Sequence, residues 1–145
     1  MKKGLFIILL IITTLLIISC PQNVVKGTVW EGTIKGTLGG LADDDENDLE
    51  AYFNPNNEMI TYITYKTGGN KETLKAKGTY TLGNNHALTA KLEGERGGTE
   101  FDVELTGVIN YYTGQGSGEY EFDTGAVKFE DDWDLMKIGS NWLYI

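Results

Sequence analysis

The chain has 145 residues, with 12 Lys and Arg against 21 Asp and Glu, a formal net charge of −9, one cysteine and one histidine. This acidity excludes nucleic acid as an expected partner, because that binding depends on neutralising phosphates with Lys and Arg. A single cysteine forms no disulfide within the chain. Zinc and copper sites usually combine several His and Cys ligands, so a single histidine without a second histidine or a usable thiol does not form one.

The first twenty residues have the pattern of an export signal. Lys2 and Lys3 precede the apolar segment 5–18, and Ser19 and Cys20 follow it. A basic start, a short apolar core and a small residue before the cleavage point are typical of a secretory leader. The apolar segment is shorter than the ~20 residues that span a bilayer. We therefore expect residues 1–19 to be a helical signal peptide that is removed.

The end of this leader, Leu16-Ile17-Ile18-Ser19-Cys20, resembles the lipobox of bacterial lipoproteins, with Ile17 where Leu is usual. The resemblance implies cleavage before Cys20, acylation of that cysteine with chains such as palmitate, and attachment to a membrane of the bacterial cell envelope. An odd thiol in an exported chain needs a role, and several acyl chains anchor stably where one is marginal. An ordinary cleaved signal and an uncleaved amino-terminal anchor are the alternatives.

Cleavage would leave a lipidated tether at 20–26 and one domain at 27–145, a length typical of a single compact domain. Without Lys2 and Lys3 the mature chain has 10 basic and 21 acidic side chains, a formal charge of −11. This charge disfavours flat contact between the domain and an anionic lipid surface. We therefore expect the acyl chains alone to hold the domain at the membrane.

Apolar or glycine residues alternate with polar ones along most of the domain, a period of two that is typical of half-buried strands. On the strand at 101–109, for example, Val103 and Leu105 are expected to face inward, and Asp102 and Glu104 outward. Turns are expected at Gly83-Asn84-Asn85, at Gly97-Gly98 and at Thr124-Gly125. In chain order, the predicted strands cover 30–38, 49–54, 59–66, 74–82, 88–93, 101–109, 118–123, 127–129 and 133–138.

Turn signals between all these segments predict a succession of hairpins, and hence an antiparallel up-and-down meander. A meander with one apolar face must pack on a second sheet or close on itself. At about eight strands, closure removes both exposed edges. The sequence therefore predicts an all-β closed barrel of about eight strands, with a two-sheet sandwich as the alternative. The inward glycines at 32, 36, 78, 107 and 118 are typical of strongly coiled strands.

Three motifs resemble those of the small lipocalin-like lipoproteins of bacteria, within the calycin type of barrel. They are Gly27-Thr28-Val29-Trp30, the Gly-x-Tyr motifs at 78–80 and 118–120, and Trp133-Asp134-Leu135-Met136-Lys137. Lipocalins carry Gly-x-Trp in the first strand, and the glycine here lies one residue further from Trp30. The resemblance implies an interior pocket closed at one end by Trp30 and open at the other between hairpin loops.

The sequence contains no arrangement typical of a catalytic or cofactor site. His86 lies in a turn without a nucleophile nearby, and Ser117 and Ser140 lack the Gly-x-Ser-x-Gly elbow of hydrolases. The glycine-rich segment 114–118 precedes a strand and so lacks the helix dipole that binds phosphate. We therefore expect no enzymatic activity, no cofactor and no metal site.

The acidic segment 43–48 resembles the start of an EF-hand loop, since Asp43, Asp45 and Asn47 match its first three ligand positions. However, Asp48 occupies the required glycine position and Asn54 occupies that of the bidentate glutamate. A solvated loop is therefore expected, with a loose, weak cation site as the alternative. A second acidic patch, Glu130, Asp131, Asp132 and Asp134, has the same interpretation.

Aromatic residues on the predicted inner face are the candidate ligand-binding residues. The leading hypothesis is a membrane-tethered module whose barrel binds a small apolar or amphipathic molecule. The candidates are Trp30, Tyr80, Phe101, Tyr120, Phe122 and Trp133.

The alternative hypothesis is that these aromatics fill a dry core and that the acidic surface contacts a basic partner. A host-contact protein or an inhibitor of lysozyme would fit, since lipoprotein inhibitors of that enzyme are similar in size and barrel shape, although this chain lacks their cysteines. An apolar void of about a few hundred Å³ would favour the first hypothesis, and a packed interior the second.

Overall fold

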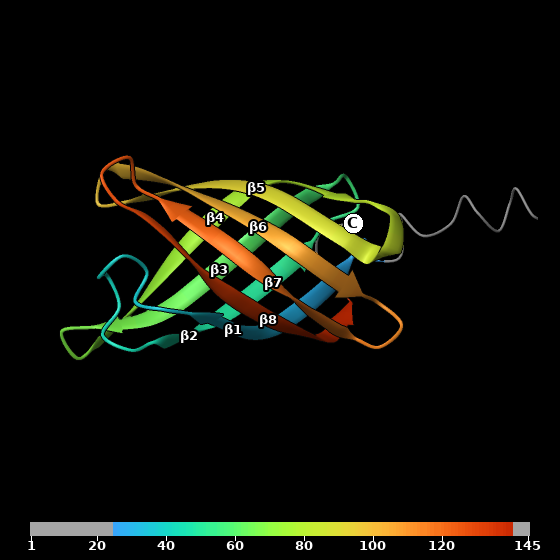
Figure 1. The fold of residues 1–145 in the computed structure, drawn as a ribbon, viewed down its shortest axis with the longest axis horizontal. Coiled ribbons are helices and arrows are strands. Elements are labelled where there is room, and N and C mark those ends of the chain that lie inside the picture. Colours follow the sequence, from blue (N-terminus) through green and yellow to red (C-terminus); the bar gives the residue numbers. More distant parts are fainter. Residues whose placement is uncertain (1–24, 141–145) are drawn as a thin grey trace, which may run out of the picture.

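The protein forms a closed barrel of eight antiparallel strands in a computed structural model that describes residues 25–140 (Figure 1). Each strand pairs with its neighbours in sequence, and β8 pairs with β1, so every strand is hydrogen-bonded on both edges within these residues. The strands are β1 (Thr28–Lys35), β2 (Glu46–Phe53), β3 (Glu58–Thr67), β4 (Asn70–Leu82), β5 (Ala87–Arg96), β6 (Thr99–Asn110), β7 (Gln115–Asp123) and β8 (Lys128–Ser140); a short 3₁₀ turn, η1 (Asn84–His86), connects β4 to β5.

The predicted all-β up-and-down barrel is therefore confirmed, and the sandwich alternative is wrong. The pairing of β1 with β8 leaves no free sheet edge among the described residues, so residues 25–140 can close the barrel without another segment. The signal peptide at 1–19, Cys20 and the tether up to residue 24 lie outside the described residues.

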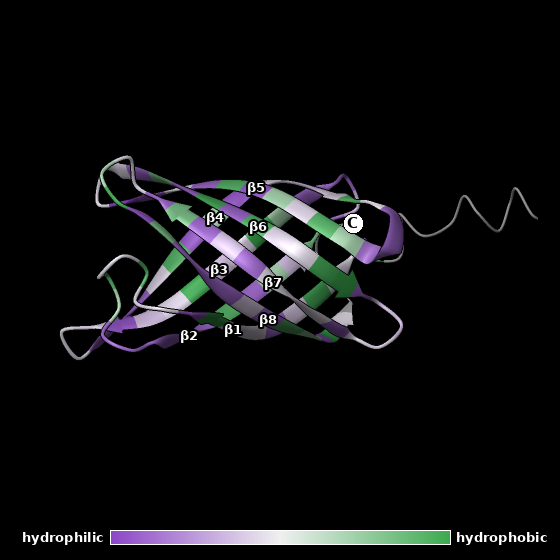
Figure 2. Ribbon diagram, viewed as in Figure 1, coloured by the Kyte–Doolittle hydropathy of each residue, from purple (hydrophilic) through white to green (hydrophobic). Residues whose placement is uncertain are grey.

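The side-chain alternation predicted for each strand decides which residues fill the barrel. On β6, Phe101, Val103 and Leu105 are 0–3% exposed, whereas the outward Glu104 side chain is 42% exposed. Figure 2 shows the same alternation of hydrophilic and hydrophobic positions along the strands. The pattern holds because successive residues of a strand point to opposite faces.

The first strand ends earlier than the sequence predicts. Gly36 and Leu38 have positive φ angles of 85° and 51°, which a β-strand does not allow, so β1 stops at Lys35. The chain instead enters the loop 36–45, which folds back so that Leu38 and Ala42 join the hydrophobic core.

The acidic segment 43–48 is divided between this loop and β2, so the prediction of a continuous solvated loop is wrong for 46–48. Asn47 is 4% exposed, and its side-chain amide donates hydrogen bonds to the carbonyl oxygens of Gly36 (2.9 Å) and Asp44 (3.4 Å). A buried amide needs such partners. Asn47 therefore holds both ends of the loop together.

Inward glycines lie where neighbouring strands approach most closely. A Cβ atom on Gly118 would lie 1.9 Å from the carbonyl oxygen of Thr106 on β6, and one on Gly78 would lie 1.9 Å from that of Lys91 on β5. No side chain fits at such distances. These positions therefore require glycine for the coiling of the strands.

The two ends of the barrel carry different connections. The amino-terminal end, where β1 begins, carries the connections 54–57, 83–86 and 111–114 and the end of β8. The far end carries the connections 36–45, 68–69, 97–98 and 124–127. In Figure 1 the amino-terminal end is on the right and the far end on the left.

The alternation along β6 predicts a large loss of stability for one substitution and almost none for its neighbour. Leu105→Ala should lower the free energy of unfolding by about 2 to 5 kcal/mol, because it removes packing from a fully buried site. Glu104→Ala should change it by no more than about 0.5 kcal/mol, because the side chain is partly solvated. Urea denaturation of both variants measures this. Equal losses would contradict the inward orientation of Leu105.

Candidate functional site

All six candidate ligand-binding aromatics face the barrel interior and are between 0% and 3% exposed. Near the amino-terminal end, the Phe53 ring contacts Trp30 at 6.3 Å and Tyr80 at 5.0 Å between ring centroids, edge to face in both pairs. The Trp30 indole donates a hydrogen bond to the Thr28 hydroxyl (2.8 Å), and the Tyr80 hydroxyl donates one to the Asn54 carbonyl (3.3 Å). These contacts close this end of the barrel.

A second aromatic group fills the barrel toward the far end. The rings of Phe101 and Phe122 stack at 5.2 Å between centroids, and Tyr120 contacts Phe129 at 6.1 Å. The Tyr120 hydroxyl donates a hydrogen bond to the carbonyl of Lys35. Leu38 and Ala42 of the loop 36–45 are buried with this group, at the end that the lipocalin resemblance implies to be open.

Trp133 completes the set from β8. Its indole nitrogen donates hydrogen bonds to the carbonyl oxygens of Thr106 (3.2 Å) and Glu119 (3.0 Å) on the two preceding strands. A side chain that lined a void large enough for water would expose surface to that void, and Trp133 is 0% exposed. The same holds for the other five candidates. They therefore fill the interior, and their role in binding a ligand remains a hypothesis.

Burial also raises the pKa of the two tyrosines among the candidate residues. Desolvation raises the pKa of Tyr80 to about 12. Desolvation, together with the negative charge of Asp131, raises the pKa of Tyr120 as well. Both hydroxyls are therefore neutral hydrogen-bond donors at neutral pH, and neither can act as a base.

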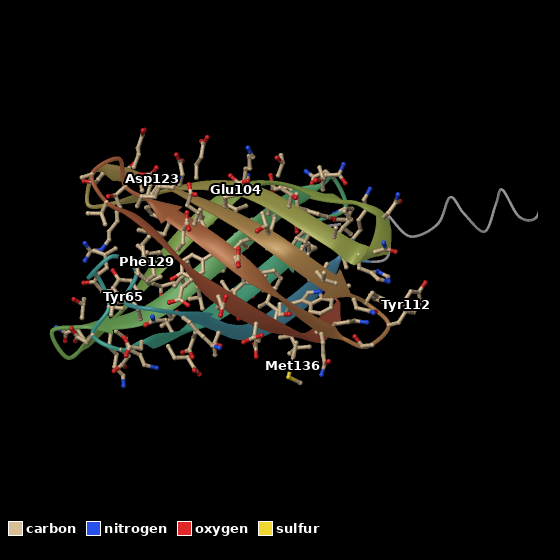
Figure 3. The ribbon with its side chains drawn as sticks, in the orientation of Figure 1. Tyr65, Glu104, Tyr112, Asp123, Phe129 and Met136 are labelled. Carbon is tan, nitrogen blue, oxygen red and sulfur yellow. The ribbon has the colours of Figure 1, made fainter. Side chains whose placement is uncertain are left out.

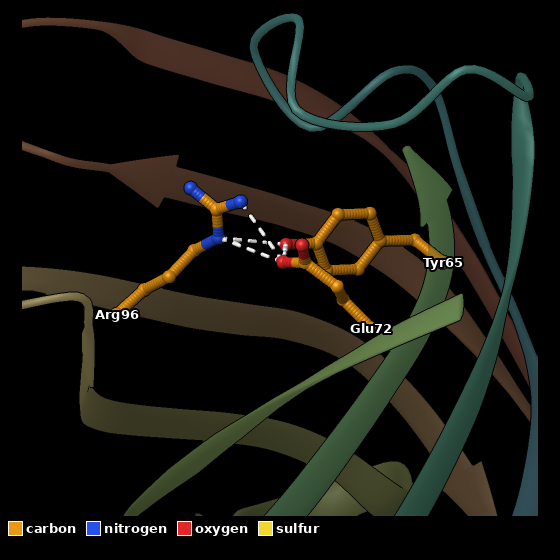
Figure 4. Close-up of polar contacts among 3 residues, drawn as sticks. All are labelled: Tyr65, Glu72 and Arg96. Carbon is orange, nitrogen blue, oxygen red and sulfur yellow. Dashed lines mark hydrogen bonds and ion pairs between the residues drawn. The ribbon is translucent and has the colours of Figure 1, made fainter. Parts of the chain in front are cut away.

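Three strands are joined at the far end by a polar cluster of Tyr65, Glu72 and Arg96 (Figure 4). The Tyr65 hydroxyl donates to the Glu72 carboxylate at 2.8 Å, and Arg96 donates to the Tyr65 hydroxyl at 2.7 Å and to Glu72 at 2.9 Å. The hydrogen bonds from Tyr65 and Arg96 lower the pKa of Glu72. The three side chains thus satisfy one another's hydrogen bonds and link β3, β4 and β5. The sequence analysis did not predict this cluster.

One polar atom in the interior lacks a hydrogen bond within the described residues, the hydroxyl of Thr61 on β3. Thr61 is 1% exposed and lies between Ala51 on β2 and Ala76 on β4. Leaving a buried hydroxyl unsatisfied destabilises a protein by about 1 to 3 kcal/mol. Sequence alternation indicated neither its burial among alanines nor its missing partner.

Replacing Thr61 by valine tests whether this hydroxyl is unsatisfied in solution. Thr61→Val should raise the free energy of unfolding by about 1 kcal/mol, because it removes the unpaired polar atom and keeps the branched shape. Thr64→Val on the outer side of the same strand is the matched control, since the Thr64 hydroxyl is 3.0 Å from that of Thr73. Urea denaturation compares the two. A loss of stability in Thr61→Val would mean that the hydroxyl has a partner inside the barrel.

The outer surface of β6, β7 and β8 carries a continuous group of carboxylates, the acidic face. Several lie directly opposite one another across neighbouring strands: Glu104 faces Glu121, and Glu121 faces Glu130 in turn. Like charges in directly opposed positions destabilise a sheet. The acidic face consists of Glu100, Asp102, Glu104, Glu119, Glu121, Asp123, Glu130, Asp132 and Asp134.

The protein neutralises this face only in part. Lys128 pairs with Glu121 at 2.9 Å, and Lys91 lies 3.9 Å from Glu104 (Figure 3 labels Glu104 and Asp123 on this face). Such exposed ion pairs contribute little. A hollow of about 390 Å³ lies along the face, lined by Glu104, Thr106, Glu119, Tyr120, Glu121, Glu130, Asp131 and Asp132.

Within residues 25–140, no three His, Asp or Glu side chains are grouped closely enough to hold a metal ion. No helix in the same range is long and apolar enough to cross a membrane. His86 is partly buried, and its ring packs edge to face against Tyr112 with 6.2 Å between centroids.

Comparisons of the chain with protein-family models, with curated proteins and with solved structures found no match. The structure defines the class as an all-β, eight-stranded closed barrel, which is compatible with the calycin type. Closer kinship with lipocalins and the lipobox remain predictions from the sequence.

Proposed function

We propose that the protein is a bacterial envelope lipoprotein, anchored through acyl chains on Cys20, whose barrel binds a basic protein partner on its acidic face. The observation that carries the proposal is the filled interior. The aromatic side chains that would line a pocket are 0–3% exposed, so a ligand inside the barrel would have to displace them. Binding is therefore assigned to the outer surface.

The distribution of charge selects the face. Directly opposed carboxylates such as Glu119 and Asp132 repel one another, and like charges in opposed positions lower the stability of a sheet. A basic partner would relieve this repulsion and would be attracted over long distance. Lysines 71, 75 and 77 lie on the outer surface of β4. The outer surface of β1 and β2 also carries carboxylates, at Glu31, Glu46 and Asp48, but the group on β6, β7 and β8 is the larger one.

The acidic face can be tested with lysozyme as the basic probe. The triple variant Glu119→Gln, Glu130→Gln, Asp132→Asn removes three carboxylates of the face. We expect it to bind lysozyme about tenfold more weakly, because the lost charges contribute mainly electrostatic attraction. In the unaltered protein, binding should weaken steeply with added salt, since exposed charges are screened over about 10 Å at 0.1 M. Calorimetric titration at two salt concentrations measures both effects.

The matched control changes the same net charge elsewhere. This control is the triple variant Glu31→Gln, Glu46→Gln, Asp48→Asn. The three residues lie on the outer surface of β1 and β2, and their substitution should leave lysozyme binding nearly unchanged. Equal losses in the two triple variants would show that net charge alone attracts the probe. Absence of salt-sensitive binding would contradict the proposed function.

Titration with fatty acids tests the alternative hypothesis that a ligand binds inside the barrel. Trp30 and Trp133 are already enclosed, so their emission should show no saturable change. A saturable change in emission that is lost in a folded Trp30→Phe variant would contradict the proposal. It would place the binding site in the barrel interior instead of on the acidic face.

The membrane anchor has a separate test in cells. Cys20→Ala should abolish incorporation of labelled palmitate and release the protein from the membrane fraction, because Cys20 is the chain's only cysteine. Ser19→Ala, which keeps a small residue before the cysteine, is the control and should remain lipidated. If the Cys20→Ala protein stays with membranes after a salt wash, the lipoprotein assignment is wrong.

A further inference from the structure

The two ends of the barrel differ in charge. The connections at the amino-terminal end read Asn-Pro-Asn-Asn (54–57), Gly-Asn-Asn-His (83–86) and Tyr-Tyr-Thr-Gly (111–114), without Asp or Glu. The far-end loop 36–45 contains three consecutive aspartates, 43–45. Glu58, which begins β3 at the amino-terminal end, is paired with Lys77 at 3.0 Å, and this hydrogen bond lowers its pKa. The connections at the amino-terminal end therefore carry no carboxylate, and the exposed Glu31 of β1, on the barrel wall, lies opposite Met136 of β8.

Exposed apolar side chains gather at the same end, and we call this group the apolar rim. Val108 and Met136 border a hollow of about 440 Å³ across β7, and Figure 3 shows Met136 and Tyr112 directed away from the barrel. The rim consists of Tyr112 (75% exposed), Met136 (63%), Ile138 (55%) and Val108 (49%).

Strand alternation places Met136 and Ile138 on the outer face of β8, the same face as Asp134. The pairing of β1 with β8 shifts register between Val29 and Trp30, so Ile138 is an additional residue on the β8 side. A bulge of this kind redirects side chains at the edge of a sheet or the rim of a barrel. Nearby, the ammonium group of Lys137 lies 3.7 Å from the centre of the Tyr111 ring. The rim therefore combines apolar and aromatic side chains with the cation of Lys137, and it borders the carboxylates of Glu31 and Asp134.

We infer that the amino-terminal end is the membrane-facing surface of the barrel, with the apolar rim in contact with the lipid headgroup boundary. The inference rests on the proposed anchor at Cys20. Val25 lies five positions after Cys20, and an extended chain spans at most about 3.6 Å per residue. The tether therefore keeps this end within about 18 Å of the lipid surface.

The chemistry of the rim fits that position. Tyrosine is enriched at membrane interfaces, where its ring is apolar and its hydroxyl is hydrated. Cations such as Lys26 and Lys137 favour an anionic lipid surface, whereas the three aspartates of the far end point away from it. The rim orients the barrel, while the acyl chains supply the anchorage.

An artificial anchor tests the orientation independently of lipidation. Residues 20–145 with Cys20→Ser and an amino-terminal hexahistidine would be bound to phosphatidylcholine–phosphatidylglycerol vesicles through a nickel-chelating lipid. A fluorophore would be attached to Tyr112→Cys or, as the matched control at the far end, to Val127→Cys, which replaces a residue that is 48% exposed. Nitroxide-labelled lipids should quench the fluorophore at 112 at least about twofold more than the one at 127.

A second pair of substitutions assigns the effect to the rim. Met136→Ser with Ile138→Ser should remove the excess quenching at 112 and leave thermal unfolding nearly unchanged, because both side chains are largely exposed. Equal quenching at 112 and 127 overturns the inference whether or not Cys20 is lipidated. The inference is also overturned if, in the absence of vesicles, the emission of the fluorophore at 112 changes with protein concentration. Such a change would mean that the rim binds a second copy of the chain.

Discussion

The structure depends on filling a narrow barrel with aromatic rings, and glycines make the space for them. Trp133 lies against glycines of β6 and β7: a Cβ atom on Gly107 would be 2.9 Å from its ring, and one on Gly116 would be 3.3 Å from it. An eight-stranded barrel is just wide enough for side chains to fill or for one small ligand. Here the rings occupy that space, so ring size and glycine placement must match.

Because aromatic side chains fill the interior and stabilise the barrel, the proposed partner binds on the outer surface. Strict alternation forces every second residue of β6, β7 and β8 into solvent, and those residues are mostly acidic. Lys128 and Lys91 neutralise only part of this charge. The proposed basic partner would compensate the carboxylates that repel one another on this surface.

The two proposed contacts fit one orientation of the molecule. The apolar rim lies at the amino-terminal end, whereas the acidic face runs along the sides of β6, β7 and β8 (Figure 1). A barrel standing on its amino-terminal end therefore leaves the acidic face open to the side. It also holds Asp43, Asp44 and Asp45 at the far end, away from anionic lipid. The sequence-based expectation that the acyl chains alone hold the domain at the membrane, without flat contact, stays a prediction, and the proposed end-on orientation agrees with its exclusion of flat contact.

The sequence by itself determined the class of fold, the hairpin order, and which side chains point inward, including Trp30, Trp133 and Leu105. These features follow from a period of two and from local turn chemistry. Only the tertiary structure decided the closure of β8 on β1, the alignment of Glu104 with Glu121, and the cluster of Tyr65, Glu72 and Arg96. It also decided that Leu38 enters the core from a loop rather than from β1, and that Asn47 is buried. The closure of β8 on β1 and the folding back of a loop depend on contacts between residues far apart in the sequence. The alignment within a hairpin depends on the geometry of its turn, which the alternation of polar and apolar residues does not specify.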